Sequence, residues 1–129
     1  MKYELRDNIA LLTFDDGKAN VVSHSFIDDM NTGLDRAGLE AAAVVITGRE
    51  GMFSGGFDLE EFAKGAEAAQ ALVTRGCEML TRLYSHPQPL LVACSGHAVA
   101  AGAFILLAAD TRVGAEGSFK LTLPETALG

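Results

Sequence analysis

Residues 92–103 read Val-Ala-Cys-Ser-Gly-His-Ala-Val-Ala-Ala-Gly-Ala, and this stretch decides the fold class. It leaves the apolar run 90–94, which is typical of a buried strand, passes through small residues, and enters a helix expected over 100–109. Residues 46–59, Ile-Thr-Gly-Arg-Glu-Gly-Met-Phe-Ser-Gly-Gly-Phe-Asp-Leu, follow the same order of strand, small residues and helix start. Buried strands that alternate with helices predict an α/β fold with parallel strand pairing.

The other elements are predicted from hydrophobic spacing and turn residues. Upstream, the pattern predicts a hairpin of strands over 3–6 and 9–14, a helix over 23–37 that begins at Ser23 or Ser25, and a buried strand over 42–47. Downstream, it predicts a short helix over 58–64, a longer helix over 67–84 and a short strand over 111–113. Neither a repeat nor a linker composition divides this series, so we expect one domain.

The composition is that of one globular domain with a hydrophobic core, since 49% of the 129 residues are hydrophobic. The net charge of −7 argues against a nucleic-acid partner. The sequence contains no apolar run long enough to cross a bilayer, so no membrane partner is expected. Residues 1–7 mix charges where a signal peptide would need an apolar stretch, which predicts a cytoplasmic protein.

The cysteines and histidines give no sign of a metal site. Cys77 and Cys94 stand in apolar contexts, and we expect both to be small buried residues with free thiols. His24, His86 and His97 are scattered and lack the spacing of metal ligands. His97 lies within the small-residue stretch quoted first, which makes it a weaker candidate for a substrate contact.

The two small-residue stretches share a possible chemistry. Glycine and alanine let a ligand approach the main chain, and the first turn of a helix offers unpaired N–H groups at the positive end of its dipole. Two such N–H groups aimed at one point can bind the oxygen of a thioester and stabilise it as an enolate. Each stretch taken alone is equally consistent with plain architecture, so the spacing leaves both interpretations open.

Four stretches resemble the crotonase (enoyl-CoA hydratase/isomerase) superfamily. Residues 53–59, Phe-Ser-Gly-Gly-Phe-Asp-Leu, resemble its motif F-[SA]-[AG]-G-x-D-[LI], and residues 95–103 resemble N-G-x-A-x-G-G-G. Residues 110–113, Asp-Thr-Arg-Val, are similar to the D-x-R-[IV] strand that comes after it in the family, and residues 123–129 to [LF]-x-[PN]-E-x-x-x-G. They come in the order and nearly the spacing of the family, so the resemblance spans the chain.

The resemblance implies a crotonase-type spiral of repeated ββα units, with residues 1–129 as its N-terminal core portion and the C-terminal helical part absent. It also implies an acyl-CoA substrate, no cofactor besides that coenzyme A thioester, and a homo-oligomer, a trimer or hexamer, when full length. The oxyanion donors of the family correspond to the backbone N–H groups of Phe57 and Ala101. Ala101 stands where most relatives have glycine, and its methyl group narrows the approach slightly.

The same resemblance assigns the substrate contacts. Lys18 is the candidate for a coenzyme A phosphate, within a loop that resembles the segment lining the adenine and phosphate end of that site. The residues expected to bind substrate or coenzyme A are Lys18, Ala19, Ser54, Gly55, Gly56, Asp58, Gly102 and Phe104. Asp58 is also expected to cap the helix that it precedes.

A single glutamate is implied as the acid/base. Hydratases of the family use two glutamates, and Phe104 stands in place of the first, while Glu125 corresponds to the second. A double-bond shift from C3 to C2 needs one base, so the pattern resembles the Δ3,Δ2-enoyl-CoA isomerase branch, with Phe104 keeping the pocket dry. Two alternatives stay open: a hydratase or other enolate-forming reaction that uses Glu125 and water, and a non-catalytic acyl-CoA-binding module.

Overall fold

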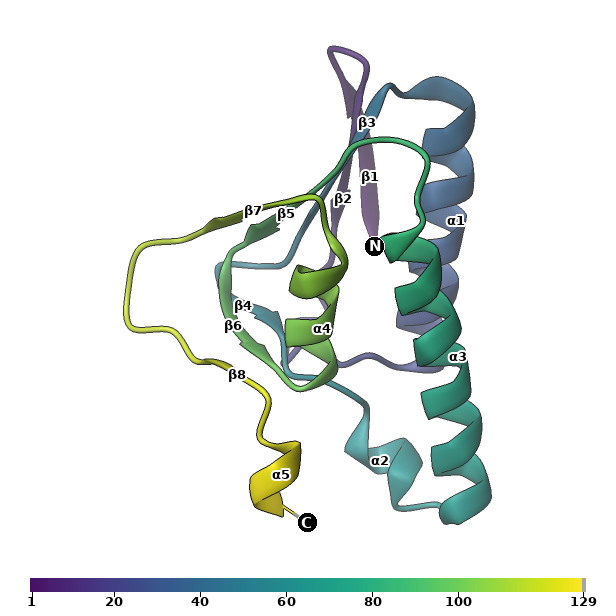
Figure 1. The fold of residues 1–129 in the computed structure, drawn as a ribbon, viewed down its shortest axis with the longest axis vertical. Coiled ribbons are helices and arrows are strands. Elements are labelled where there is room, and N and C mark those ends of the chain that lie inside the picture. Colours follow the sequence, from purple (N-terminus) through teal and green to yellow (C-terminus); the bar gives the residue numbers. More distant parts are fainter. Residues whose placement is uncertain (129) are drawn as a thin grey trace.

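Two β-sheets and a layer of helices make up the protein (Figure 1). The computed structural model describes residues 1–128 and, within that range, every side chain except those of residues 126 and 128. Within this range, no helix is long and apolar enough to span a membrane.

The larger sheet has five strands in the order β1-β2-β3-β5-β7. Its strands are β1 (Lys2–Arg6), β2 (Ile9–Thr13), β3 (Ala43–Thr47), β5 (Leu90–Cys94) and β7 (Thr111–Gly114). The hairpin β1–β2 is antiparallel, and every other pairing in this sheet is parallel. The predicted hairpin and the predicted parallel α/β pairing are therefore confirmed.

The smaller sheet was not predicted from the sequence. Three short strands, β4 (Gly51–Ser54), β6 (Gly96–Val99) and β8 (Leu121–Thr122), pair in parallel in the order β4-β6-β8. The first two lie inside the small-residue stretches, which the sequence pattern indicates as turns. Each stretch therefore runs from the larger sheet into the smaller one before it reaches its helix.

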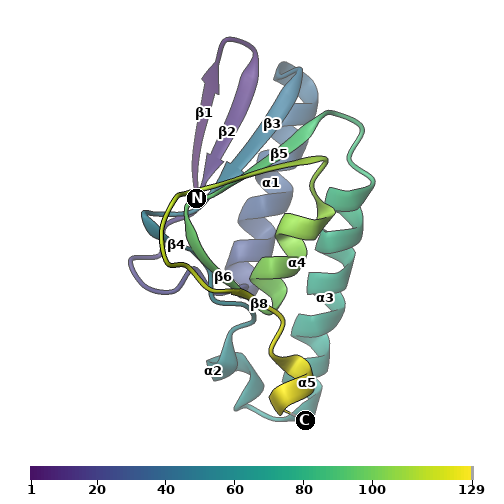
Figure 2. The same cartoon turned by 60° about the vertical axis from the view of Figure 1, so that its left-hand side comes forward.

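The long helices lie on one side of the larger sheet (Figure 2). They are α1 (His24–Glu40), α3 (Ala66–Tyr84) and α4 (Ala101–Ala108), and α2 (Leu59–Phe62) and α5 (Glu125–Leu128) are single turns. The three long helices agree with the predicted ones to within a few residues. The helix α1 begins after Ser23, whose side chain accepts a hydrogen bond from the Phe26 N–H at 3.2 Å, as one of the two predicted caps.

The hydrophobic core lies between the larger sheet and these helices. Leu12, Ile46 and Val92 are in register on three neighbouring parallel strands, and none is more than 1% exposed. Burying such side chains contributes about 1.5–3 kcal/mol each. Cys94 is buried as predicted, but the prediction for Cys77 was wrong: this residue is exposed on α3, outside the stripe that faces the core.

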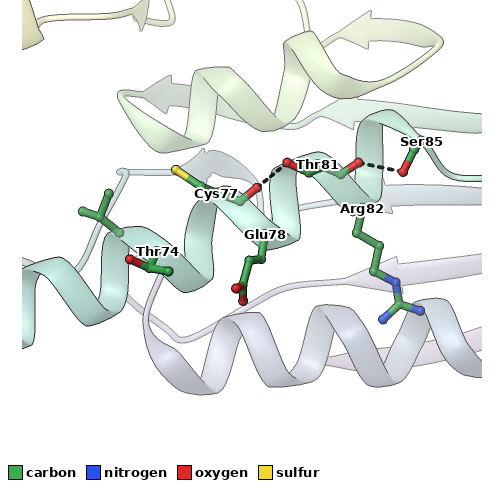
Figure 3. A pocket seen from close by; sticks show the side chains of 7 residues that line it. Thr74, Cys77, Glu78, Thr81, Arg82 and Ser85 are labelled. Atoms are coloured by element: carbon green, nitrogen blue, oxygen red, sulfur yellow. Dashed lines mark hydrogen bonds between the residues drawn. The ribbon is translucent and has the colours of Figure 1, made fainter.

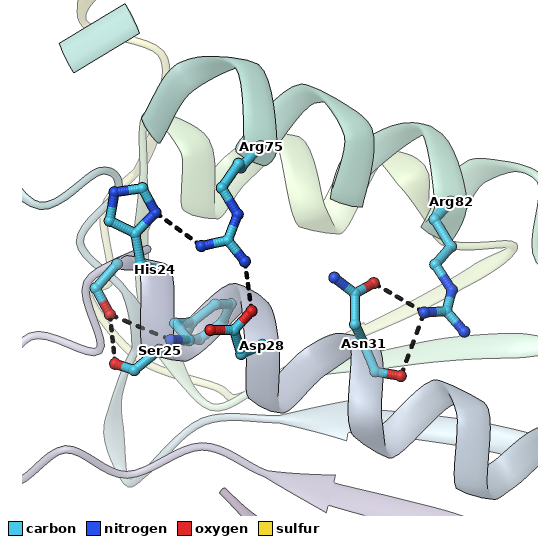
Figure 4. A network of polar contacts seen from close by, with 8 residues as sticks. His24, Ser25, Asp28, Asn31, Arg75 and Arg82 are labelled. Carbon is cyan, nitrogen blue, oxygen red and sulfur yellow. Dashed lines mark hydrogen bonds and ion pairs between the residues drawn. The ribbon is translucent and has the colours of Figure 1, made fainter. Parts of the chain in front are cut away.

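Polar contacts between α1 and α3 add to this packing (Figure 4). Arg75 on α3 forms a hydrogen bond with His24 Nδ1 at 2.9 Å and an ion pair with Asp28. Further along the same helix, Arg82 donates to the side chain of Asn31 at 2.9 Å. These contacts fix how α3 lies beside α1, and α3 in turn supports one wall of the candidate active site.

Candidate active site

The two small-residue stretches end side by side, because β4 and β6 are neighbouring parallel strands. We call residues 55–58 the Phe57 loop and residues 100–102 the Ala101 loop. A Cβ atom added to Gly56 would lie 2.9 Å from Ala100 Cβ and 3.4 Å from the backbone N of Ala101. Only glycine therefore permits this approach, and the peptide that leads to Phe57 lies against the peptide that leads to Ala101.

The backbone N–H groups of Phe57 and Ala101 lie on these two adjoining loops, Phe57 at the wall of the cavity described below and Ala101 buried beside it, 2% exposed. Within residues 1–128, leaving aside the side chains of residues 126 and 128, neither N–H donates a hydrogen bond to a carbonyl or a side chain. Ala101 is the first residue of α4, so its N–H lies at the positive end of that helix. Two donors that lie on adjoining loops and lack partners of their own are the arrangement that an oxyanion needs.

The direction of the Phe57 loop is set by Val22, which is fully buried. The Val22 N–H donates to the carbonyl of Gly56 at 2.7 Å, and the Asp58 N–H donates to the carbonyl of Val22 at 3.2 Å. The ring of Phe57 covers Gly76 on α3, where an added Cβ would come within 2.4 Å of the ring. Phe57 is thus held by the backbone hydrogen bonds of Gly56 and Asp58 to Val22 and by the packing of its ring on Gly76.

Asn20 supports the site and was missed by the sequence analysis. It is 1% exposed, and its side-chain Nδ2 donates to the carbonyls of Phe14 at 2.9 Å and of Met52 and Phe53 at 3.3 Å each. Its Oδ1 accepts from the Asp16 N–H at 2.9 Å. One buried amide thus joins the segment that carries Lys18 to the end of β4.

Ser54 continues this network toward the Phe57 loop. Its Oγ donates to the carbonyl of Asn20 at 2.8 Å and accepts from the Gly56 N–H at 3.3 Å. Gly102 packs on the other side, where an added Cβ would come within 2.5 Å of the Ser54 carbonyl oxygen. Ser54, Gly56 and Gly102, which were predicted to contact substrate, do not line the cavity described below and instead make the contacts that hold the two loops.

Ala100 holds the Ala101 loop in an uncommon backbone conformation, with φ 52° and ψ −122°. This conformation suits glycine and costs an L-residue about 1–3 kcal/mol. The Ala100 N–H donates to the carbonyl of Thr122 at 2.9 Å, and the carbonyl of Ala100 accepts from Phe104 N–H at 3.2 Å. The signal for Ala100 was present in the sequence, because the motif N-G-x-A-x-G-G-G has glycine at this position as well.

A cavity of about 750 Å³ opens in front of both loops. Six of the predicted site residues line it: Lys18, Ala19, Gly55, Phe57, Asp58 and Glu125. Val99 and Ala100 complete the wall on the side of the Ala101 loop, and Leu59 and Phe62 contribute apolar surface from α2. The structure therefore brings the segment with Lys18, the Phe57 loop and Glu125 together around one space.

Phe104 lies outside this space. Its side chain is 41% exposed and lines a separate cavity of about 320 Å³ together with Leu80, Tyr84 and Leu107. The reason is its place on α4: Ala101, at the start of the helix, faces the Phe57 loop, whereas residue 104 faces α3. The sequence analysis expected Phe104 to keep the cavity of Glu125 dry, and this prediction was wrong because Phe104 does not line that cavity.

The acidic residues at the cavity have different partners. The Asp58 side chain accepts a hydrogen bond from the Glu60 N–H at 2.9 Å and caps α2, as predicted. Glu125 is exposed at the start of α5. Glu60 also lines the cavity, from α2. Glu125 and Glu60 are thus the two glutamates at the cavity wall that the structure describes.

Asp16 organises the segment that carries Lys18. Burial raises the pKa of its carboxyl, but hydrogen bonds from the backbone N–H groups of Asn20, Lys18 and Val21 outweigh burial and bring the pKa below its usual range. A pKa lowered on folding means that the carboxylate stabilises the segment above its unfolded-state pKa. That stabilisation is lost as the pH falls through the folded-state pKa.

A further cavity lies along the outer face of α3 (Figure 3). It has a volume of about 680 Å³ and is lined by α3 residues, among them Cys77, Glu78 and Arg82. The Thr81 hydroxyl donates to the carbonyl of Cys77 at 2.8 Å, so its polar group is satisfied within the helix. None of the predicted site residues lines this cavity. Across residues 1–128, no group of three His, Cys, Asp or Glu side chains is placed to hold a metal ion.

Comparison with known proteins identifies the family of this arrangement. Residues 4–129 match the family model described as enoyl-CoA hydratase/isomerase. The chain belongs to the enoyl-CoA hydratase/isomerase family. The resemblance found in the sequence motifs is therefore confirmed for nearly the whole chain.

Individual relatives agree with this assignment. A probable enoyl-CoA hydratase of Bacillus subtilis is 34% identical over 125 residues, which cover 94% of this chain and 48% of the relative. An enoyl-CoA hydratase/isomerase family protein from Pseudomonas syringae is 46% identical, with a TM-score of 0.95 over 98% of this chain and 55% of the other. An enoyl-CoA isomerase from Mycobacterium tuberculosis is 38% identical, with a TM-score of 0.92 over 99% of this chain and 56% of the other.

These likenesses confirm the predicted crotonase fold and its N-terminal location in the longer proteins. The chain spans about half the length of the relatives it matches. One relative is named a hydratase and another an isomerase, so the names do not separate the two reactions. Gly129, the last residue of the fourth family motif, lies outside the described residues.

Proposed function

We propose that this family member acts as a Δ3,Δ2-enoyl-CoA isomerase with Glu125 as its single acid/base. One observation carries the proposal: Glu125 and the Phe57 loop line the same cavity, and Ala100, next to Ala101, lines it too. The position of the first hydratase glutamate is taken by Phe104, which has no carboxylate and lies outside this cavity. One base beside a pair of N–H donors suits a proton shift better than the addition of water.

The reaction proceeds in this arrangement by two proton transfers. The thioester oxygen accepts hydrogen bonds from the N–H groups of Phe57 and Ala101, and the Glu125 carboxylate removes a proton from C2. The electron pair of that C–H bond then forms an enolate, whose negative charge the two donors stabilise. The C3–C4 double bond moves to C2–C3 as Glu125 returns the proton to C4. No other reactant is needed, because the proton that leaves is the proton that returns.

Coenzyme A is proposed to enter past the segment that carries Lys18. Lys18 and Ala19 line the cavity, and Lys18 carries a positive charge in a protein of net charge −7. The Arg49 side chain donates to the carbonyl of Lys18 at 2.8 Å from its Nε, which fixes the backbone there. A phosphate of coenzyme A bound at Lys18 would leave the thioester arm free to reach the two loops.

The decisive test compares two glutamates of one cavity. In the longest native polypeptide that contains this chain, we expect a 3-enoyl-CoA to give the conjugated 2-enoyl thioester, followed by its absorbance. Glu125→Gln should slow this conversion about 10²–10⁴-fold, the usual contribution of an acid/base. Glu60→Gln, the matched change on α2, should alter the rate no more than a few-fold. Full activity of Glu125→Gln would rule out the proposed role.

Two other functions give different outcomes in the same assay. A hydratase that uses Glu125 and water would consume the conjugated absorbance of a 2-enoyl-CoA. A non-catalytic acyl-CoA-binding module would bind the thioester without converting either substrate. Assembly into a trimer or hexamer and a cytoplasmic location stay predictions, and sedimentation of the native polypeptide would check the first.

A further inference from the structure

The strand β8 is weakly held by its own side chains. It has two residues, Leu121 and Thr122, and Leu121 is 60% exposed, so little apolar burial keeps it in place. It pairs in parallel with β6, and at the two ends of this pairing the Ala98 N–H donates to the carbonyl of Lys120 and the Ala100 N–H to the carbonyl of Thr122, each at 2.9 Å. A strand this short needs further contacts to keep its register.

His97 supplies such a contact. Its Nδ1 accepts a hydrogen bond from the Lys120 backbone N–H at 2.9 Å. Its ring meets Phe119 edge to face, with the ring centroids 5.5 Å apart and the planes at 87°. His97 does not line the cavity of about 750 Å³, so these contacts replace the substrate contact that the sequence suggested. The His97 side chain therefore contacts both Phe119 and Lys120, the two residues that precede β8.

The place of these His97 contacts matters because β6 and β8 both lead directly into the candidate active site. After β8 the chain reaches Glu125 within three residues, and after β6 it reaches Ala101 within two. The pairing of β6 with β8 thus fixes the start of α5 relative to the start of α4. Any slip of β8 would move the carboxylate of Glu125 away from the oxyanion donors.

We propose that His97 is a positioning residue, which sets the distance between Glu125 and the Ala101 loop through its hydrogen bond to Lys120. This inference rests on the proposed acid/base role of Glu125. A misplacement of about 1 Å can cost a reaction about 10²-fold in rate, so a single bond at this place is enough to matter. β8 pairs with β6 and not with the segment that carries Lys18, so the proposed contact of coenzyme A with Lys18 should be unaffected.

Three variants of His97 separate the hydrogen bond from the ring contact. His97→Phe keeps an aromatic ring against Phe119 but has no acceptor. His97→Asn places its Oδ1 near the position of Nδ1 and can accept from the Lys120 N–H. His97→Gln carries its amide one bond further out and should not reach. We expect kcat for the isomerisation to fall about tenfold or more in the Phe and Gln variants, with KM nearly unchanged, and to recover in the Asn variant.

Amide hydrogen exchange at Lys120 provides a readout independent of activity. Exchange should be slow in the native polypeptide and in His97→Asn, and fast in His97→Phe. Fast exchange in the native polypeptide would overturn the contact. Fast exchange in His97→Phe with an unchanged kcat would overturn the positioning role. If Glu125→Gln keeps full activity while the Lys120 exchange shows the expected pattern, the proposed function fails. The hydrogen bond between Lys120 and His97 is then a structural contact without a catalytic role.

Discussion

The Phe57 loop and the Ala101 loop adjoin the same cavity, which Phe57 and Ala100 line, but they are held by different means. The Phe57 loop depends on buried side-chain hydrogen bonds, from Asn20 to β4 and from Ser54 onward. In the part of the chain that the structure describes, no side-chain hydrogen bond holds residues 100–102, where a strained backbone, backbone hydrogen bonds and close packing act instead. Buried polar side chains therefore help to fix one loop, whereas the other is fixed without them.

The difference explains which substitutions each loop tolerates. A polar network tolerates changes of shape poorly, because a lost partner leaves a buried group without a hydrogen bond. A packed backbone turn tolerates loss of atoms but not their addition. Substitutions test this contrast first where the two loops touch and then within each loop, in the longest native polypeptide that contains the chain.

The largest effect is expected where the loops meet, for Gly56→Ala. Its φ of +94° already disfavours alanine, and the added Cβ would lie 2.9 Å from Ala100 Cβ and from the Val99 carbonyl oxygen. Left-handed strain and overpacking together should lower the free energy of unfolding by about 2–5 kcal/mol. Urea denaturation measures this, and the loss of alignment should also reduce isomerisation.

Gly17→Ala is the matched control for Gly56→Ala. Gly17 has a φ of +73°, but an added Cβ would meet nothing within 4 Å. In the control, the free energy of unfolding should therefore fall only by the part due to backbone strain, about 1–2 kcal/mol. Equal losses at the two glycines would show that the contact between the loops contributes nothing to stability.

The second effect is expected for Asn20→Asp, which removes the amide donor that holds β4, the strand leading into the Phe57 loop, while keeping size and shape. The carbonyls of Phe14 and Phe53 would then face a carboxylate in a buried place. We expect the free energy of unfolding to fall by about 2–3 kcal/mol. Asn8→Asp is the control, since Asn8 also has a positive φ, of 65°, but is exposed. A similar loss for both variants would contradict the role given to the buried amide.

The sequence predicts the larger sheet and the helices better than it predicts the smaller sheet. Helical and strand periodicity report burial, so Leu72, Met79 and Leu83 mark the face of α3 that packs on the core. Strands β4, β6 and β8 are short and are built partly of glycine, serine and histidine. Their pairing depends on backbone bonds between distant segments, which leave no apolar alternation to detect.

The same limit applies to the site. Motif resemblance could propose Phe57, Ala101 and Glu125, because those motifs are continuous in the chain. Asn20 was missed because one of its partners, the carbonyl of Phe53, lies 33 residues away in sequence. Phe104 was assigned to the cavity from its alignment, but the rotation of α4 decides where a side chain points. A local sequence pattern does not predict contacts that depend on how distant elements pack.

The smallest effect is expected for Ala100→Gly in the Ala101 loop, and its sign is the sharpest test of the contrast. With φ 52° and ψ −122°, Ala100 should be relieved of strain by glycine, and we expect the free energy of unfolding to rise by about 1 kcal/mol. Ala101→Gly, one residue on, should instead lower it by up to about 1 kcal/mol, because Ala101 lies in α4 and its φ is not positive. Thermal unfolding of both variants measures the pair. If both lose stability, Ala100 is not strained, and the Ala101 loop is held by its packing against Gly56 and by the bond from Ala100 to Thr122 alone.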